Sequence, residues 1–405
     1  MNDLDVLVVG GGAAGLFTAH QLRRRGARVT VVERGPIGGD QSCSAGNTGF
    51  AGTQGSAPLA VPGAGSLRRL LDPAGSPHLR PRPDPGLWRW VRDFRRACTE
   101  EAASTSSRVL YALKKHSLAL LAELDSAHFH APGIVLAYRS PEGFERAAAA
   151  AARSPVPLRV LFPAELAELE PDTEFAVAGA LYNEEGAYLE VPRFLHAFAR
   201  DLAEDGVEIL DRTEVTGFEL SGGKVVSVRV PGRELRPGTV VLAAGSWTAS
   251  LARLLGQRIA LQPVKGYSVT VKTPPGAPRL PVLLPEGPVA VSPLDGELRF
   301  AGSLELTGMD RRIVPRRVAA MLAPVRSCLP ALDLTGEQRV WAGLRPCAPD
   351  GLPYVGPAPA VDNLFLCCGH GHIGMGLAPS TGRLLAQLLT GERPDLDLRP
   401  FRIDR

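Results

Sequence analysis

Residues 4–33 read LDVLVVGGGAAGLFTAHQLRRRGARVTVVE. The Val- and Leu-rich runs at both ends of this stretch are typical of parallel strands that are buried on both faces. Between them, residues 13–25 carry apolar side chains such as Leu16 and Leu22 at helical spacing, and Gly26 ends the pattern. The stretch therefore predicts a strand, a helix and a second strand, joined by a tight first turn.

The first turn carries a glycine motif. Gly10, Gly12 and Gly15 fit G-x-G-x-x-G, in which the first glycine permits the sharp turn, the second lets a diphosphate approach the backbone, and the third lets helix and strand pack closely. The free N–H groups at the start of the helix, around Ala13 and Ala14, then face an anion. We expect this unit to bind a dinucleotide.

An acidic residue stands where such a unit binds the ribose. Glu33 ends the second strand, eighteen positions after Gly15, and can accept hydrogen bonds from an adenosine ribose. A 2′-phosphate would be repelled there, so NADP is disfavoured. These residues alone leave NAD and FAD open.

The composition is that of a globular protein with two or three domains. The chain has 405 residues, of which 45% are apolar and 21% charged, and its net charge of +3 is spread without a basic block, so nucleic acid is not an expected partner. No stretch is long enough to span a bilayer, and no leader precedes the first strand, so we expect a cytoplasmic protein. The six cysteines lack C-x-x-C spacing, which favours reduced thiols.

A long loop of small residues, 34–49, follows Glu33 in place of the next strand–helix step of an NAD-only domain. Long loops inside compact domains tend to be functional, although disorder is the alternative. Its N–H groups and hydroxyls can follow a cofactor beyond the first phosphate. The candidate contacts here are Arg34, Ser42, Ser44, Asn47, Thr48 and Gly49.

Residues 364–389 repeat the order strand, glycine loop, helix. Gly369, Gly371 and Gly374 fit the same motif, but no strand follows the helix and no ribose acid is present, so we reject a second dinucleotide. We expect the helix, from Leu377 to Leu389, to direct its positive end at a flavin ring, where negative charge forms on reduction. The candidate contacts are Gly371, His372, Ile373, Gly374 and Met375.

The middle of the chain predicts two inserted helices between residues 87 and 128, a hairpin at 215–230, a buried strand at 239–245, and a β-rich stretch at 258–299 with proline turns. A further helix is expected around 318–329. We add Val215, Ala244, Gly245 and Trp247 to the candidate cofactor contacts, because they stand beside the hairpin and the end of the buried strand.

With these motifs in place, the sequence resembles the FAD-dependent D-amino-acid oxidase and glycine oxidase superfamily, and within it the bacterial D-amino-acid dehydrogenases. The likeness runs nearly end to end. Besides the first glycine motif and Glu33, it is carried by 44–49 (SAGNTG), Ala57-Pro58, Pro62-Gly63, 263–267 (PVKGY), 343–346 (GLRP), 350–353 (DGLP), 369–372 (GHGH), Ala378-Pro379 and Gly382.

The resemblance implies an α/β fold class, α+β overall. A Rossmann-like FAD-binding domain of the glutathione-reductase type is expected, with an inserted substrate domain made of an antiparallel sheet plus helices. The expected boundaries are 1–85, 155–258 and 340–405 for the FAD-binding domain, and 86–154 and 259–339 for the substrate domain.

The resemblance also implies oxidation of an amino acid to an imino acid, which water hydrolyses to a 2-oxo acid and ammonia. Arg345 matches the family's carboxylate-binding arginine, and a planar guanidinium suits this role because it can hold a carboxylate through two parallel hydrogen bonds. Where glycine oxidases place a tyrosine, this chain has Ala290, which favours the dehydrogenase branch. Tyr267 then becomes the candidate second carboxylate contact.

For the mechanism we expect direct hydride transfer from the substrate Cα to flavin N5, with a neutral amine and no general base. His370 and His372 are the titratable residues of the glycine loop, and His372 is a third catalytic candidate beside Arg345 and Tyr267. The alternative role for both histidines is to stabilise the loop by hydrogen bonds. No third ligand is suggested near them, so a metal site is not expected.

Three functions stay open at this point. The first is a D-amino-acid dehydrogenase that passes electrons to a quinone or another acceptor. The second is an oxidase of glycine, sarcosine or a cyclic amino acid such as D-proline or hydroxyproline, which makes peroxide from O2. The third is a flavoprotein whose FAD is structural. Family dehydrogenases deliver electrons at the inner membrane, yet no amphipathic anchor is found, and the oligomeric state stays open.

Overall fold

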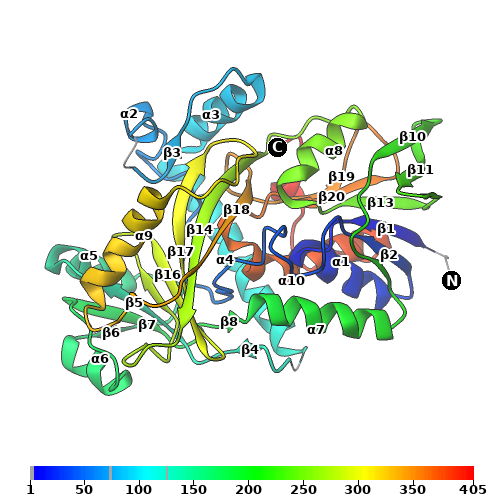
Figure 1. The fold of residues 1–405 in the computed structure, drawn as a ribbon. Helices are drawn as coiled ribbons and strands as arrows, with labels where there is room; N and C mark the ends of the chain where they lie inside the picture. Colours follow the sequence, from blue (N-terminus) through cyan, green and yellow to red (C-terminus); the bar gives the residue numbers. More distant parts are fainter. Residues whose placement is uncertain (1–3, 73–74, 125) are drawn as a thin grey trace.

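The computed structural model describes residues 4–72, 75–124 and 126–405. Figure 1 shows two large sheets with helices around them. The first is six-stranded, in the order β19-β20-β13-β1-β2-β9, and is parallel except for the pair β19 and β20. Its strands are β1 (Asp5–Val9), β2 (Arg28–Val32), β9 (Glu208–Leu210), β13 (Thr239–Leu242), β19 (Tyr354–Pro357) and β20 (Leu364–Cys368).

The expected N-terminal unit is present as β1, α1 (Ala13–Arg23) and β2, and Glu33 follows β2 directly. Helices α1, α7 (Val191–Glu204) and α10 (Gly374–Leu389) share one apolar core with one face of the sheet. The opposite face packs on α8 (Thr248–Leu254) and on a three-stranded sheet. That small sheet consists of β10 (Gly217–Ser221), β11 (Lys224–Val230) and β12 (Arg233–Leu235).

Helices α1 and α10 come from opposite ends of the chain and pack side by side, blue and red in Figure 1. A Cβ at Gly382 of α10 would lie 2.7 Å from the carbonyl carbon of Phe17 in α1, so only glycine allows this approach. Helix α10 begins at Gly374, earlier than the expected Leu377, since its first turn packs on the chain around Phe50 instead of fraying at its glycines.

The second large sheet runs in the order β18-β14-β17-β16-β15-β5-β7-β6, with the short β3 also paired to β17. Its pairs are antiparallel except β15 with β5 and β17 with β3. Its strands are β3 (His78–Leu79), β5 (Ile134–Tyr138), β6 (Leu158–Leu161), β7 (Gly179–Asn183), β14 (Gln262–Lys272), β15 (Val282–Leu284), β16 (Val289–Leu294), β17 (Glu297–Leu306) and β18 (Arg339–Cys347).

The membership of this sheet differs from the expected domain boundaries. Strands β6 and β7 fall in the stretch 155–258, and nearly all of β18 falls in 340–405, both of which were expected in the FAD-binding domain. They join the other sheet because β7 pairs with β5, and β18 pairs with β14 over nine residue pairs. Such long-range pairing leaves no local mark in the sequence.

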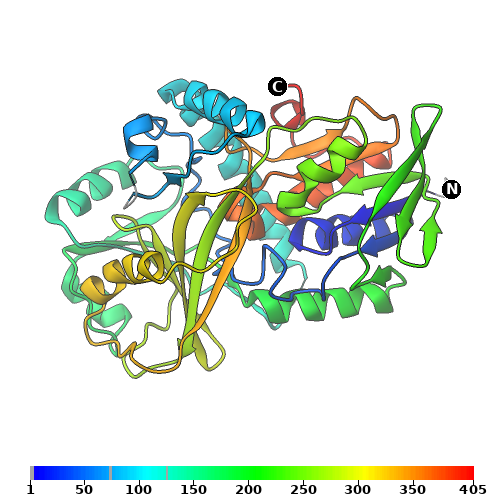
Figure 2. The same ribbon diagram turned by 45° about the horizontal axis from the view of Figure 1, so that its top comes forward.

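The remaining helices lie around the second sheet, except that α4 (Glu100–Ala122) packs on α10 and joins the core of the first sheet. Figures 1 and 2 both show α9 (Pro315–Cys328) lying against β16 and β17, where its apolar residues join the sheet's core. The two expected inserted helices are α3 (Pro85–Ala97) and α4 (Glu100–Ala122), capped by Asp84 and Thr99. The other elements are α2 (Leu67–Leu70), α5 (Pro141–Ala151), α6 (Pro163–Leu169), β4 (Phe129–His130) and β8 (Tyr188–Leu189). Within the described ranges, no helix combines the length and the apolar character needed to cross a membrane.

Candidate active site

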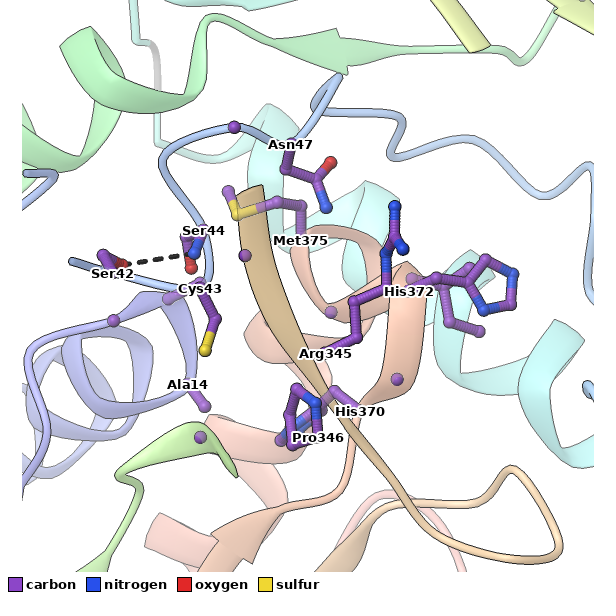
Figure 3. A pocket seen from close by; sticks show the side chains of 18 of the residues that line it. Ala14, Ser42, Cys43, Ser44, Asn47, Arg345, Pro346, His370, His372 and Met375 are labelled. Carbon is purple, nitrogen blue, oxygen red and sulfur yellow. Dashed lines mark hydrogen bonds between the residues drawn. The ribbon is translucent and has the colours of Figure 1, made fainter. Parts of the chain in front are cut away.

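A cavity of about 600 Å³ lies between the two large sheets (Figure 3). Its wall combines the first turn of α1, the loop after β2, the end of β13, strands β16 to β18, and the start of α10. The predicted cofactor contacts that line it are Gly10, Gly12, Ala13, Ala14, Glu33, Arg34, Ser42, Ser44, Asn47, Thr48, Val215, Ala244, Gly245, Trp247, Gly371, His372, Ile373, Gly374 and Met375. The structure thus brings together residues from both ends of the chain.

The glycines of the first motif have different surroundings. Gly10 has φ +116°, and a Cβ there would lie 2.5 Å from the Ala243 carbonyl oxygen, while a Cβ at Gly15 would lie 1.8 Å from the Gly10 carbonyl oxygen. Both glycines therefore hold the turn together, and Gly15 does not line the cavity. At Gly12 a Cβ would meet only Ser44 Oγ at 3.7 Å, which leaves room for a ligand beside the backbone.

The loop after β2 is fixed to the second sheet. Arg299 of β17 donates through Nη1 to the carbonyl oxygens of Ala45 and Asn47, at 2.8 and 3.0 Å, and Ser292 Oγ donates to the Thr48 carbonyl oxygen at 2.6 Å. These hydrogen bonds hold the loop in place, so the alternative of disorder is wrong for this loop. Gly49 does not line the cavity, because its φ of +76° turns the chain toward Leu189.

The end of the cavity next to β2 has a fixed negative charge. Glu33 accepts hydrogen bonds from Gly11 N at 2.8 Å and from Gly35 N at 3.0 Å, one at each carboxylate oxygen. Beside it, the Arg34 guanidinium carbon lies 4.3 Å from the ring centroid of Trp247. The buried Arg34 Nε has no hydrogen-bond partner among the described residues, so this end offers both an acceptor and a donor to a ligand.

The opposite wall is the start of α10. A short 3₁₀ turn, Gly371–Ile373, leads into the helix, which has no side-chain cap and no acidic residue in its first turn. The first N–H groups of a helix lack intrahelical partners and carry partial positive charge. With the first turn of α1, the cavity therefore receives two positive helix ends.

These features fit FAD. The space at Gly12 beside the N-terminus of α1 suits a diphosphate, Glu33 suits the ribose, and the N-terminus of α10 suits an electron-rich ring. The donors and the acceptor that the structure leaves open match the parts of one extended dinucleotide.

Arg345 is the charged residue of β18 that faces the cavity (Figure 3). It donates through Nη1 to the Ser303 carbonyl oxygen at 2.7 Å and through Nη2 to the Gly302 carbonyl oxygen at 3.3 Å. Burial lowers the pKa of Arg345, and no carboxylate of the described residues pairs with it. A guanidinium has five N–H donors, so Arg345 retains donors, and an uncompensated charge, for an anion.

The guanidinium rests against a neighbouring glycine. Gly266 of β14 lies on the same face of the sheet, and a Cβ there would lie 1.7 Å from Arg345 Nη1. The φ of Gly266 is not positive, so its backbone does not itself require glycine. The position is small because Arg345 needs the space.

Replacing Gly266 with alanine is therefore expected to displace Arg345 and to raise KM for the substrate by about 10- to 100-fold, because small misplacements of an anchoring group are costly. Gly336→Ala is the control, since a Cβ there meets nothing within 4 Å. Steady-state kinetics and FAD content check the result. Unchanged KM in Gly266→Ala would show that the position of Arg345 does not matter for binding.

Tyr267 does not line the cavity, and this is a correction to the expected carboxylate contact. Because successive side chains of a strand point to opposite faces, Tyr267 points away from Gly266 and Arg345, into the core beneath α9. It is fully buried there, and its hydroxyl donates to Glu305 Oε2 at 3.3 Å. Lys265 pairs with the same carboxylate oxygen at 3.1 Å, so this group of residues is structural.

Both histidines of the glycine loop line the cavity, but their surroundings differ. His370 is buried and shares a hydrogen bond of 2.9 Å between Nε2 and Thr381 Oγ1, as the stabilising alternative predicted. His372 faces the cavity, where burial, helped by the charges of Arg345 and Lys114, lowers its pKa to about 3. Near neutral pH His372 is therefore an uncharged polar group.

Lys114 of α4 was missed by the sequence reasoning. It lines the cavity although only 3% of its surface is exposed. A signal existed, because Leu110, Leu113, Lys114, Ser117 and Leu121 form one helical stripe, and Lys114 interrupts its apolar character. Other missed lining residues are Gln54, Ser303 and Trp341, which no motif marked.

Known proteins resemble the chain over its whole length. The family model described as FAD dependent oxidoreductase (DAO) matches residues 5–388. A D-amino acid dehydrogenase of Granulibacter bethesdensis is 30% identical, with 99% of each chain covered, and a D-amino-acid oxidase of Bradyrhizobium diazoefficiens is 29% identical, with 98% of this chain and 97% of the relative covered. The crystal structure of glycine oxidase from Geobacillus kaustophilus superposes with a TM-score of 0.78 at 25% identity, covering 99% and 98% of the two chains.

Proposed function

The chain belongs to the DAO family of FAD-dependent oxidoreductases, and from this premise we propose that it oxidises a D-amino acid to the 2-oxo acid and ammonia. The observation that carries the proposal is Arg345, a buried cation without an acidic partner that faces the cavity. An amino acid presents the carboxylate that such a group binds. The names of the relatives support the same substrate class.

The protein's part in the reaction is positioning. When bound, FAD would supply the acceptor for the hydride, a proton with two electrons, that leaves Cα. Arg345 fixes the substrate carboxylate and with it the direction of the Cα–H bond. Only Glu33 and Glu214 are acidic among the described residues that line the cavity, and both lie at the ribose end, where Thr213 N donates to the Glu33 carbonyl oxygen at 2.7 Å. Among the described residues no carboxylate base stands near Arg345, which fits hydride transfer from a substrate whose amine is already neutral.

The substrate end has room for a side chain. Ala290 of β16 and Ala301 of β17 are cross-strand partners, and both line the cavity. Two methyl groups leave space where larger residues would close it. This observation favours an amino acid with a side chain over glycine.

An oxidase of glycine, sarcosine or a cyclic amino acid such as D-proline is the second candidate. The resemblance to the structure of a glycine oxidase supports it, and so does the relative named as an oxidase. The two candidates differ in the acceptor, which is a quinone for a dehydrogenase and O2 for an oxidase.

Anaerobic addition of D-alanine is expected to bleach the flavin absorbance of the purified holoprotein, whereas L-alanine is expected to leave it unchanged. A panel of D- and L-amino acids with glycine, sarcosine and D-proline extends the test. Reoxidation in air with one peroxide per substrate would select the oxidase, and reoxidation by a quinone without peroxide the dehydrogenase. If no amino acid bleaches the flavin, the proposal is wrong and the FAD is structural.

A further inference from the structure

A second buried cation lies in the wall of the cavity. Lys114 is 3% exposed, and its Nζ donates to the carbonyl oxygens of Gln54 at 2.6 Å and Gly55 at 3.1 Å. Gln54 and Gly55 line the same cavity, so the ammonium group lies at the cavity wall. A lysine has three N–H donors, and two are used.

In the part of the chain that the structure describes, no negative charge compensates this ammonium. Lys114 forms no ion pair among the described residues, and the lowering of its pKa to about 7 has burial as its one cause. The acidic residues that line the cavity, Glu33 and Glu214, lie at its ribose end. A buried charge without a partner is costly, and a bound anion would remove this cost.

Lys114 and Arg345 belong to the same end of the cavity. Helix α4 packs on α10 close to His372, because Ser380 N donates to Ser117 Oγ at 3.1 Å and Ser380 Oγ donates to the Leu113 carbonyl oxygen at 2.7 Å. Lys114, Arg345 and His372 line the same cavity, and both charges lower the pKa of His372. They come from different elements, α4 and β18, so they approach this end from two sides. A substrate whose first carboxylate is bound by Arg345 meets a second cation there.

We propose that Lys114 binds a second carboxylate on the substrate side chain, so that acidic D-amino acids of the aspartate or glutamate type are the preferred substrates. The proposal rests on the proposed function and adds the substrate class. The free donor of Lys114 and its charge attract a side-chain carboxylate, whereas an amide or an alkyl group would leave the cation unpaired.

The kinetic test compares acids with their amides, which have nearly the same shape. At about pH 6, where a lysine with a pKa of about 7 is protonated, the wild-type holoprotein is expected to show kcat/KM at least about tenfold higher for D-aspartate than for D-asparagine, or for D-glutamate than for D-glutamine. Lys114→Met is expected to abolish this preference. Lys114→Arg is expected to restore part of it.

The matched control is Lys115→Met, which removes the exposed neighbouring lysine of the same helix. This variant is expected to keep the wild-type preference. Visible flavin absorbance and the melting temperature verify that each variant binds FAD and folds.

A binding measurement without turnover separates recognition from catalysis. Succinate and butyrate have the same number of carbon atoms and differ in one carboxylate, and their dissociation constants follow from the perturbation of the flavin spectrum. Succinate is expected to bind wild type at least about tenfold more tightly than butyrate. The difference should vanish in Lys114→Met and persist in Lys115→Met.

The proposal would be overturned if wild type showed equal kcat/KM for acids and amides and bound succinate and butyrate equally. In that case, reduction of the flavin by neutral D-amino acids would still support the proposed function. A lower kcat of Lys114→Met for acids and amides alike would also overturn it, since that pattern indicates a role in positioning the loop at Gln54. If no amino acid reduces the flavin, the proposed function is wrong and the proposal with it. If Lys114→Met does not retain FAD, the proposal is tested by wild type alone, through the comparison of acids with amides and of succinate with butyrate.

Discussion

Arg345→Leu is expected to lower kcat/KM for amino acids about a thousandfold while FAD stays bound. The guanidinium faces the substrate end with spare donors, and its loss leaves the substrate α-carboxylate without its partner in a buried site. The loss should appear mainly in KM, because the interaction is made before the Cα–H bond breaks. Steady-state kinetics with a D-amino acid measure kcat and KM, and the flavin absorbance of the purified variant measures the bound FAD.

Arg339→Leu is the matched control for this variant. Arg339 lies on the same strand, but its side chain is 63% exposed and pairs with Glu297 at 2.9 Å. Its removal should change kcat/KM less than about twofold, because exposed ion pairs contribute little. An unchanged KM in Arg345→Leu would show that Arg345 does not bind the substrate. Loss of FAD would show that Arg345 holds the cofactor instead.

Gly12→Leu is expected to produce a folded protein that does not bind FAD. The backbone of Gly12 is extended, with φ −77° and ψ −178°, so a side chain is tolerated there, and a Cβ meets only Ser44 Oγ. A leucine would fill the space beside the N-terminus of α1, where the diphosphate is expected. FAD affinity should fall by at least about a hundredfold, while the free energy of unfolding of the apoprotein should change by about 1 kcal/mol or less.

The readouts for Gly12→Leu are flavin absorbance, circular dichroism and the melting temperature of the apoprotein. Gly336→Leu serves as the control, since a Cβ there meets nothing within 4 Å. A yellow Gly12→Leu protein with wild-type FAD content would mean that the diphosphate does not pass Gly12.

The sequence predicted the parts of the fold that have a local signature. The unit β1–α1–β2 follows from apolar runs and three glycines, because the physical demands of a tight turn fall on adjacent residues. The start of α10 was placed late, because Gly374 and Gly376 have low helix propensity and packing around Phe50 overrides it. The strands β6 and β7 and most of β18 lie in stretches that were expected in the FAD-binding domain, yet they pair in the second sheet, since β7 and β18 have partners that are distant in the chain.

The candidate site was likewise predictable where it has a local sequence motif, and not where it depends on packing between distant elements. The motif around Arg345 could be recognised, and so could the glycine loop at 369–374, but the alternation of side chains along β14 decides that Gly266 and not Tyr267 lies beside the Arg345 guanidinium. Which β14 side chains point toward Arg345 depends on which face of the sheet packs against α9. The sequence of β14 alone does not reveal that face. Lys114 was overlooked because a single lysine in an amphipathic helix is usually exposed.

We expect the N-termini of α1 and α10 to hold one FAD, and we expect Arg345 to bind the substrate carboxylate beside it. A crystal structure of the purified protein with FAD and an unreactive carboxylate such as succinate tests this claim most directly. We expect one FAD per chain with its diphosphate at Gly12, and a carboxylate hydrogen-bonded to the Arg345 guanidinium. A carboxylate bound away from Arg345, or an FAD that does not contact the start of α10, would contradict it.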